Sequence, residues 1–126
     1  MKKRLLLLSC VALFFFITGC KKARQIHLLS AHTWVVADHS TMGTIGDEYT
    51  FHDNRLFFQT TGALTIDGQW DTYPITHTPG KNRLDIQSDL GQMQYDILLL
   101  TATKLELSQA WNGSISPLKM ILVPKK

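Results

Sequence analysis

Apolar and polar residues alternate in short segments along most of the chain after residue 31. Alternation with a period of two predicts β-strands that bury one face, because successive side chains of a strand point to opposite sides. Turn residues such as Asp53-Asn54 separate the segments. The expected strands are residues 32–38, 48–52, 55–60, 64–66 with 69–73, 84–86, 92–101, 104–111 and 118–123. No long amphipathic helix interrupts them, so the pattern predicts an all-β domain.

Asp67-Gly68 interrupts the alternation, and the pattern alone does not decide which local structure it forms. The pair precedes Trp70 and could form either the two-residue turn of a hairpin or a glycine bulge within one bent strand. We favour the bulge. About eight strands joined by short turns then give an antiparallel up-and-down meander, and closure into a small barrel removes its two open edges.

Large side chains occupy the positions that this alternation places inside the barrel. They are Trp34, Tyr49, Phe51, Phe58, Trp70, Met93, Tyr95, Ile97, Leu105, Leu107 and Met120. An eight-stranded barrel has room for its own side chains or for one small ligand. We therefore expect a mostly filled barrel with at most a shallow cleft at one end, near Trp34 and Trp111.

The N-terminus follows a different pattern. Lys2, Lys3 and Arg4 precede an uncharged apolar run over residues 5–17, which is too short to span a bilayer and is typical of a secretory signal peptide. The next residues complete Ile17-Thr18-Gly19-Cys20, which resembles the lipobox of bacterial lipoproteins. The resemblance implies that residues 1–19 are a signal peptide cut before Cys20, that the Cys20 thiol is lipidated, with palmitate as an expected acyl chain, and that the new amino terminus is usually acylated as well.

Two alternatives to this leader stay open. An ordinary secreted protein could carry a cysteine here by chance, and Leu7-Leu8-Ser9-Cys10 also resembles a lipobox. Cutting before Cys10 would leave only a short leucine run as the apolar part of the leader, so Cys20 is the better candidate. The mature chain then keeps no free thiol and can form no internal disulfide.

Between the leader and the first strand, Ala23, Ile26 and Leu29 are spaced as on one edge of a short helix. We expect residues 20–30 to form a lipidated tether or short helix and residues 31–126 to form the barrel domain. Lys21-Lys22 lacks the aspartate that resembles an inner-membrane retention signal. The outer membrane of a bacterial envelope is therefore the expected location, with the leaflet left open.

The net charge of +3 does not predict an anionic partner. Lys2, Lys3 and Arg4 supply the whole excess, so residues 20–126 are neutral. A nucleic-acid-binding domain would need a basic face or stripe. We expect no nucleic-acid partner.

The strand motifs resemble those of small bacterial lipocalin-like lipoproteins over residues 29–122. That family carries a Trp on the first strand, then an aromatic-x-Phe strand, a Gly-x-Trp strand and a late Tyr-x-Ile strand. The matching residues are Trp34, Tyr49 and Phe51, Gly68 and Trp70, Tyr95 and Ile97, followed by Leu105 and Leu107. The resemblance implies a lipocalin-like barrel.

No pattern of residues predicts catalysis. The histidines fall in separate elements without metal-ligand spacing, so we expect no metal and no cofactor; they are His27, His32, His39, His52 and His77. Ser114 and Ser116 lie in an Asn-Gly turn region without a nucleophile elbow. Asp85 and Asp96 fall on polar strand faces. We therefore expect a protein that is not an enzyme.

Five aromatic residues are the candidate site: Trp34, Phe51, Trp70, Tyr95 and Trp111. They either fill the core or line a ligand pocket at the barrel mouth. The leading hypothesis is a lipoprotein held in the membrane by acyl chains on Cys20, which binds a small apolar or amphipathic ligand without catalysis. The alternative is a filled barrel that docks another envelope protein, and a hydrolase is least favoured.

Overall fold

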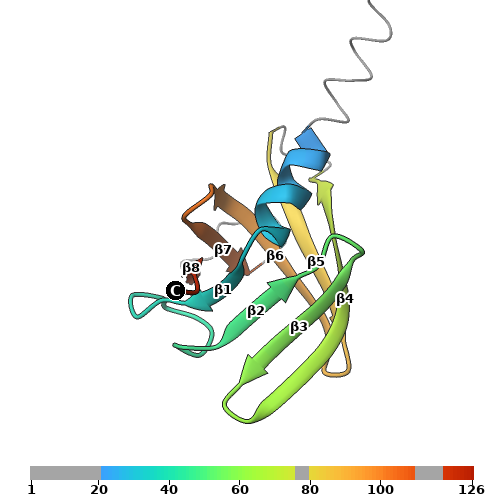
Figure 1. Ribbon diagram of the computed structural model, residues 1–126. Coiled ribbons are helices and arrows are strands. Elements are labelled where there is room, and N and C mark those ends of the chain that lie inside the picture. Colours follow the sequence, from blue (N-terminus) through green and yellow to red (C-terminus); the bar gives the residue numbers. More distant parts are fainter. Residues whose placement is uncertain (1–20, 76–79, 110–117) are drawn as a thin grey trace, which may run out of the picture.

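The computed structural model describes residues 21–75, 80–109 and 118–126. It contains eight strands: β1 (Thr33–Val36), β2 (Glu48–Phe51), β3 (Leu56–Thr61), β4 (Leu64–Pro74), β5 (Asn82–Ser88), β6 (Gly91–Leu100), β7 (Leu105–Gln109) and β8 (Lys119–Pro124). Each strand pairs antiparallel with its neighbours in sequence, and β8 pairs with β1, so the sheet closes into a barrel (Figure 1). The expected all-β, up-and-down eight-stranded barrel is confirmed.

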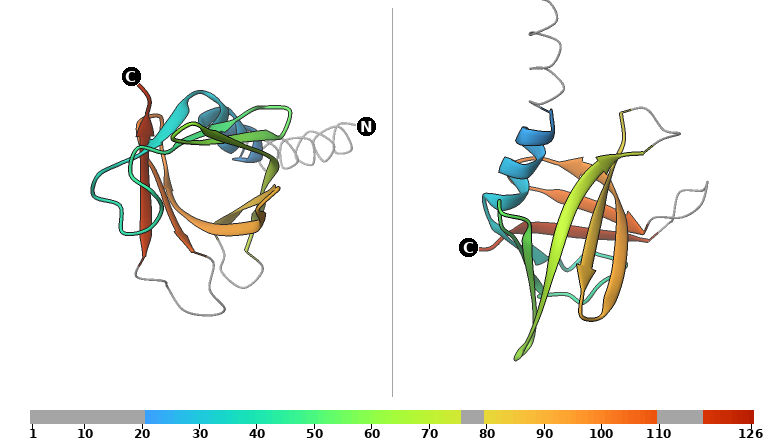
Figure 2. Two further views of the ribbon diagram at one scale, coloured as in Figure 1. Left: turned by 90° about the horizontal axis from the view of Figure 1, so that it is seen from below. Right: turned by 90° about the vertical axis from the view of Figure 1, so that its right-hand side faces the viewer.

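A helix over residues 21–30 precedes the barrel. Leu29 is buried in the core and Ile26 packs against it, whereas Ala23 is exposed. The indole Nε1 of Trp34 donates a hydrogen bond of 2.9 Å to the carbonyl oxygen of Leu29, which attaches the end of the helix to β1. Both views in Figure 2 place the helix beside one end of the barrel. No helix among the described residues is long and apolar enough to cross a membrane.

The meander gives the barrel two different ends. The helix, the β2–β3, β4–β5 and β6–β7 connections and the end of β8 lie at one end, which we call the helix end. The β1–β2, β3–β4, β5–β6 and β7–β8 connections lie at the other, which we call the mouth end. In Figure 1 the helix is at the top, and the β3–β4 and β5–β6 hairpins are at the bottom.

Side chains fill most of the interior. The buried apolar residues are Leu29, Trp34, Val36, Tyr49, Phe51, Phe57, Ile66, Trp70, Leu84, Ile86, Tyr95, Leu105, Leu107, Met120 and Leu122. Phe51 connects the aromatic members, with its ring centroid 5.3 Å from that of Phe57 and 5.4 Å from that of Trp70. Edge-to-face and tilted ring contacts of this kind stabilise a core beyond the area that they bury.

The third strand buries Phe57 and not Phe58, which the alternation placed inside. Phe57 is 0% exposed, whereas Phe58 is half-buried and its ring meets His52 on the outer face. The tight turn at residues 52–55 sets this register by pairing Phe51 with Phe57. Directly paired residues share a face, so Phe57 follows Phe51 inward.

Neither expected form of the Asp67-Gly68 break occurs. β4 runs unbroken from Leu64 to Pro74, and its pairing with β3 and β5 has no register shift at Gly68. A Cβ atom at residue 68 would clash with the carbonyl oxygen of Gln87 on β5. The glycine therefore permits a close approach of two backbones, which is another common reason for glycine inside a strand.

The sixth strand changes face near its end. Its register against β7 shifts between Ile97 and Leu99, as it does at a β-bulge. Leu99 is consequently exposed, and Leu100 packs against the core instead. Unbroken alternation over residues 92–101 predicts that Leu99 shares a face with Tyr95, and the register shift makes that prediction wrong.

Candidate functional site

The structure separates the five candidate aromatic residues. Trp34, Phe51 and Trp70 lie in the core, with at most 2% of each exposed. Tyr95 is 9% exposed and lines a cleft. Trp111, like Cys20, lies outside the described residues.

Trp34 belongs to the attachment of the helix and lines neither of the clefts described below. Besides its bond to Leu29, its ring meets the edge of His32, with 5.7 Å between the ring centroids. One of these clefts opens at the mouth end and the other on the outer wall. Neither is the cleft expected beside Trp34.

The cleft at the mouth end, which we call the mouth cleft, has a volume of about 410 Å³. Its lining comes from the β1–β2 connection, the first half of β6 and the last residue of β7. These residues are Met42, Gln92, Met93, Gln94, Tyr95 and Gln109. Met93 and Tyr95 contact the core from the inner face of β6, so the cleft reaches the edge of the barrel interior.

The floor of the mouth cleft is apolar and contains polarisable methionine side chains. The hydroxyl of Tyr95 lies 3.5 Å from the thioether sulfur of Met93, to which it donates a weak hydrogen bond. Burial raises the pKa of Tyr95, so the phenol stays neutral at ordinary pH. Methionine is unbranched and polarisable, and therefore adapts to guests of irregular shape.

Three glutamines line the mouth cleft, but only Gln109 shares the inner face with Tyr95, because the two residues pair directly. Gln92 and Gln94 alternate with Met93 and Tyr95, so their amides lie on the outer face of β6. Gln92 donates to a carboxylate oxygen of Asp85 at 3.0 Å, and Gln94 donates to the hydroxyl of Tyr73 at 3.1 Å. Gln109 is exposed and has no side-chain partner among the residues that the structure describes. A free amide beside an apolar floor can both donate to and accept from a ligand's polar group.

The first part of the β1–β2 connection is held against β8, and this contact positions Met42. The backbone N–H groups of Thr41 and Met42 donate to the carbonyl oxygen of Lys119 at 2.8 and 3.2 Å. The hydroxyl of Ser40 donates to the carbonyl oxygen of Ile121 and accepts from its N–H. Gly43 follows with a φ of +79°, which glycine adopts without strain.

Asp47 holds the second part of this connection. Its carboxylate is 5% exposed and accepts hydrogen bonds from the hydroxyl of Thr61 at 3.0 Å and the amide of Gln59 at 3.5 Å. No cation pairs with Asp47 among the described residues. These bonds fix the connection to β3, so that both of its parts are attached to the barrel wall.

Three exposed aliphatic side chains lie at hairpin tips of the mouth end. Ile45 and Leu90 lie in the β1–β2 and β5–β6 connections and Leu64 begins β4, and they are 58%, 72% and 61% exposed. We call these residues the mouth ring. Hairpin tips usually carry polar residues, so these side chains offer apolar surface to a partner or ligand.

A second cleft, of about 320 Å³, lies on the outer wall and is polar. Its lining residues are Arg55, Gln69, Trp70, Asp71, Asp85 and Gln87. The guanidinium carbon of Arg55 lies 5.3 Å from the ring centroid of Trp70, and its Nε lies 3.5 Å from Asp71. Arg55 has a φ of +74°, which is an uncommon value for a residue other than glycine. The tight turn between β2 and β3 imposes this backbone conformation.

No three histidine, cysteine or acidic residues among the described residues come together as a metal site would require. His39 lies 3.1 Å from Asp38, and its hydrogen bond lowers the pKa of Asp38. Both residues are exposed on a connection, and the hydroxyl of the adjacent Ser40 bonds to the backbone of Ile121. No protein-family model, curated protein or solved structure matches the chain significantly.

The sequence pattern did not predict that Met42 and Gln109 line the mouth cleft. Met42 lies in a connection, where periodicity carries no information. The only sequence feature that could have indicated Met42 is its apolar side chain among turn-forming residues, in Ser40-Thr41-Met42-Gly43.

Proposed function

We propose that this protein is a lipid-anchored, non-catalytic lipoprotein of the bacterial envelope that binds one small amphipathic ligand in the mouth cleft. Acyl chains on Cys20 hold it in a membrane, for which Ile17-Thr18-Gly19-Cys20 is the support. The outer membrane is the proposed location, because Lys21-Lys22 follows Cys20 without an aspartate.

The composition of the mouth cleft is the observation that carries the proposal. Met42, Met93 and Tyr95 give the cleft an apolar floor, and Gln109 places an exposed amide beside it. Ligand sites commonly combine an apolar lining with a few polar groups that orient the guest. A ligand with an apolar body and an uncharged polar head would match both parts.

The barrel interior favours a shallow site over a deep one. Because core side chains occupy the barrel, the ligand would lie at its edge and not along its axis. This placement differs from a lipocalin-like barrel with a central cavity, although the strand motifs resemble that family.

A second candidate function follows from the mouth ring. A filled barrel with exposed Ile45, Leu64 and Leu90 could dock another envelope protein through these tips. In this case the mouth cleft would receive a side chain of the partner instead of a free ligand.

Binding of a fluorescent amphipathic probe, N-phenyl-1-naphthylamine, tests the first candidate. Saturable binding at one site should occur with the wild type and fall at least tenfold in Met42→Asp, which places a charge in the cleft. Leu99→Asp is the matched control, because Leu99 is a half-exposed apolar residue on the outer wall. Equal binding by both variants, or none by the wild type, would contradict the ligand proposal.

The same variants distinguish the second candidate. If the mouth ring docks a protein, Leu64→Asp and Leu90→Asp should release a partner that cross-links to the wild type, without changing probe binding. Native mass spectrometry of protein purified from its host would then detect a protein complex and no bound small molecule.

A further inference from the structure

The neutral mature chain separates its charges along the barrel. Every basic residue among residues 21–75, 80–109 and 118–126 except Lys119 lies in the helix, in or beside a connection at the helix end, or after β8. Five acidic residues lie toward the mouth end, namely Asp38, Asp47, Glu48, Asp67 and Asp89. Asp53, Asp71 and Glu106 lie toward the helix end, where basic residues outnumber them, and Glu48 pairs with Lys125. The zero net charge therefore conceals a positive end and a negative end.

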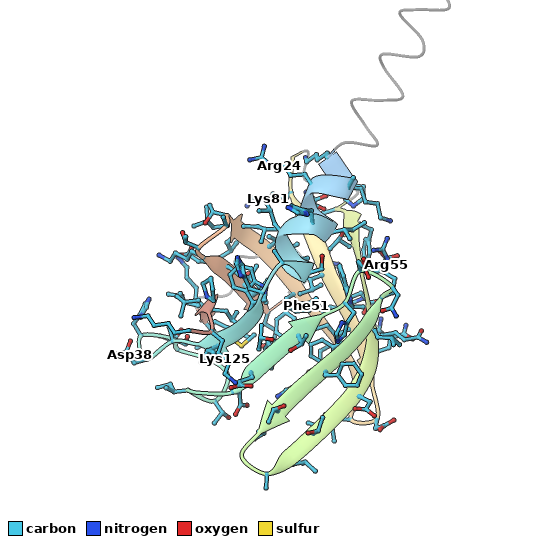
Figure 3. The ribbon with its side chains drawn as sticks, in the orientation of Figure 1. Arg24, Asp38, Phe51, Arg55, Lys81 and Lys125 are labelled. Carbon is cyan, nitrogen blue, oxygen red and sulfur yellow. The ribbon has the colours of Figure 1, made fainter. Side chains whose placement is uncertain are left out.

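Cations lie on the helix and in two connections at the helix end, and we call this group the basic end. It consists of Lys21, Lys22 and Arg24 on the helix, Arg55 in the β2–β3 turn, and Lys81 before β5. Arg55 is half-buried and the others are exposed. Figure 3 labels Arg24 and Lys81 toward the top of the molecule and Arg55 at its right-hand side, and Figure 2 shows the start of β5 across the barrel end from the helix.

Acidic neighbours neutralise little of the basic end. The Asp71 carboxylate forms ion pairs with Lys22, at 3.4 Å between Oδ1 and Nζ, and with Arg55, at 3.5 Å between Oδ1 and Nε. Lys21, Arg24 and Lys81 are exposed and have no ion-pair partner among the described residues. Free cations on one end of a small domain create a positive potential that attracts an anionic surface.

We propose that the basic end rests on the anionic headgroups of the bilayer in which Cys20 is anchored. This inference rests on the proposed lipid anchor, because Lys21 is adjacent to Cys20 in the chain and the helix extends from the same end. Basic clusters next to a lipidated residue are attracted to anionic leaflets, and they strengthen attachment by acyl chains. Contact at the basic end directs the mouth cleft away from the bilayer.

Lysine footprinting tests the proposal on the full-length protein purified from membranes and reconstituted into vesicles. Acetylation rates are compared between vesicles of pure phosphatidylcholine and vesicles in which part of the lipid is phosphatidylglycerol. Lys81 should react about threefold more slowly on the anionic vesicles, because headgroups would cover it. Lys119 at the mouth end should react at equal rates on both. Raised salt should remove the protection, since it screens exposed charges.

Charge-reversal variants provide the matched comparison. Arg24→Glu with Lys21→Glu should abolish the protection of Lys81, whereas Lys119→Glu should preserve it. All three residues are exposed and unpaired in the described part of the chain, so folding should be unaffected. Circular dichroism of each variant verifies the fold.

Fatty-acid labelling of the same preparations separates this inference from the proposed anchor. Labelled protein whose Lys81 reacts equally on both kinds of vesicle would overturn the docking of the basic end and leave the anchor intact. Unlabelled protein that is still protected on anionic vesicles would overturn the anchor and leave the docking intact. Protection that survives Arg24→Glu with Lys21→Glu would also overturn the inference.

Discussion

Trp70 illustrates how one residue joins the core to the outer wall. Its ring meets Phe51 inside the barrel, and Arg55 covers its other side. Its Nε1 donates to the carbonyl oxygen of His52 at 2.9 Å, so the turn between β2 and β3 depends on it as well. Only 2% of Trp70 is exposed, which makes it a core residue although it also borders the outer cleft.

We expect Trp70→Ala to lower the free energy of unfolding by about 3–5 kcal/mol, the usual cost of removing a buried tryptophan. Trp70→Phe should cost less, because it retains part of the packing, although it loses the hydrogen bond to His52 and some buried volume. Tyr73→Ala, at a 37% exposed position on the same strand, is the control and should have a small effect. Denaturant melts measure all three. A small loss in Trp70→Ala would show that the core does not depend on this ring.

Tyr49 predicts how stability changes at alkaline pH. Burial is the main reason why the pKa of Tyr49 lies well above its ordinary value of 10.0, and electrostatic repulsion from Tyr95 and Asp47 raises this pKa further. The folded state therefore disfavours the phenolate, whereas the unfolded chain ionises near pH 10. Stability should be unaffected by Tyr49 below that pH and should fall as the pH rises above it.

Urea melts between pH 8 and pH 11 provide the measurement. The wild type should lose stability steeply above pH 10, and Tyr49→Phe should lose it less steeply because the ionisable group is gone. Identical slopes in the two proteins would mean that Tyr49 is not the group responsible.

At the scale of the elements, alternation predicted the strands because burial on one face determines which positions are apolar. It could not determine register where two adjacent positions are both apolar, as at Phe57 and Phe58. A turn three residues away decided which of them faces inward. The bulge between Ile97 and Leu99 escaped for a related reason, because in the run from Ile97 to Leu100 every residue is apolar and no polar position marks the change of face.

The candidate site was less predictable than the strands. Burial of Trp34, Phe51 and Trp70 follows from strand patterning, but the mouth cleft requires Met42 to be placed beside β6. That placement depends on hydrogen bonds between residues 40–42 and β8, which are distant in sequence. No local pattern contains such information.

Gly68 gives a prediction at this scale. Gly68→Ala should destabilise the β4–β5 pairing by about 1–3 kcal/mol, because the added methyl group would force backbones apart. Gln69→Ala, at the exposed neighbouring position, is the control for changes of side chain on the same strand. Hydrogen exchange should accelerate at residues 84–88 in Gly68→Ala. Unchanged exchange rates at residues 84–88 would show that the β4–β5 pairing does not require the close backbone approach at Gly68.

At the scale of the whole molecule, the helix end and the mouth end differ in both charge and polarity. The basic end lies beside the proposed anchor, and the mouth ring and cleft lie opposite. Binding and attachment would therefore occupy separate parts of the surface. A substitution in one part should leave the other function unaltered.

The proposed anchor predicts a difference between the two cysteines. Wild-type protein should incorporate labelled palmitate and lose residues 1–19, whereas Cys20→Ser should incorporate none and keep its leader. Cys10→Ser is the matched control and should behave as the wild type. Labelling followed by mass measurement of the N-terminus reports both steps. A labelled Cys20→Ser protein would refute the lipobox assignment.

The pairing of β1 with β8 has a consequence for how the molecule is made. β1 gains its second neighbour only when β8 is present, through pairs such as Val35 with Val123. Ribosomes add about 5–20 residues each second, so roughly 5 to 20 s separate the synthesis of these two strands. Until then the first strand keeps an open edge, and the barrel cannot close. In the proposed lipoprotein, this delay would let the chain enter a secretion channel before the barrel can close.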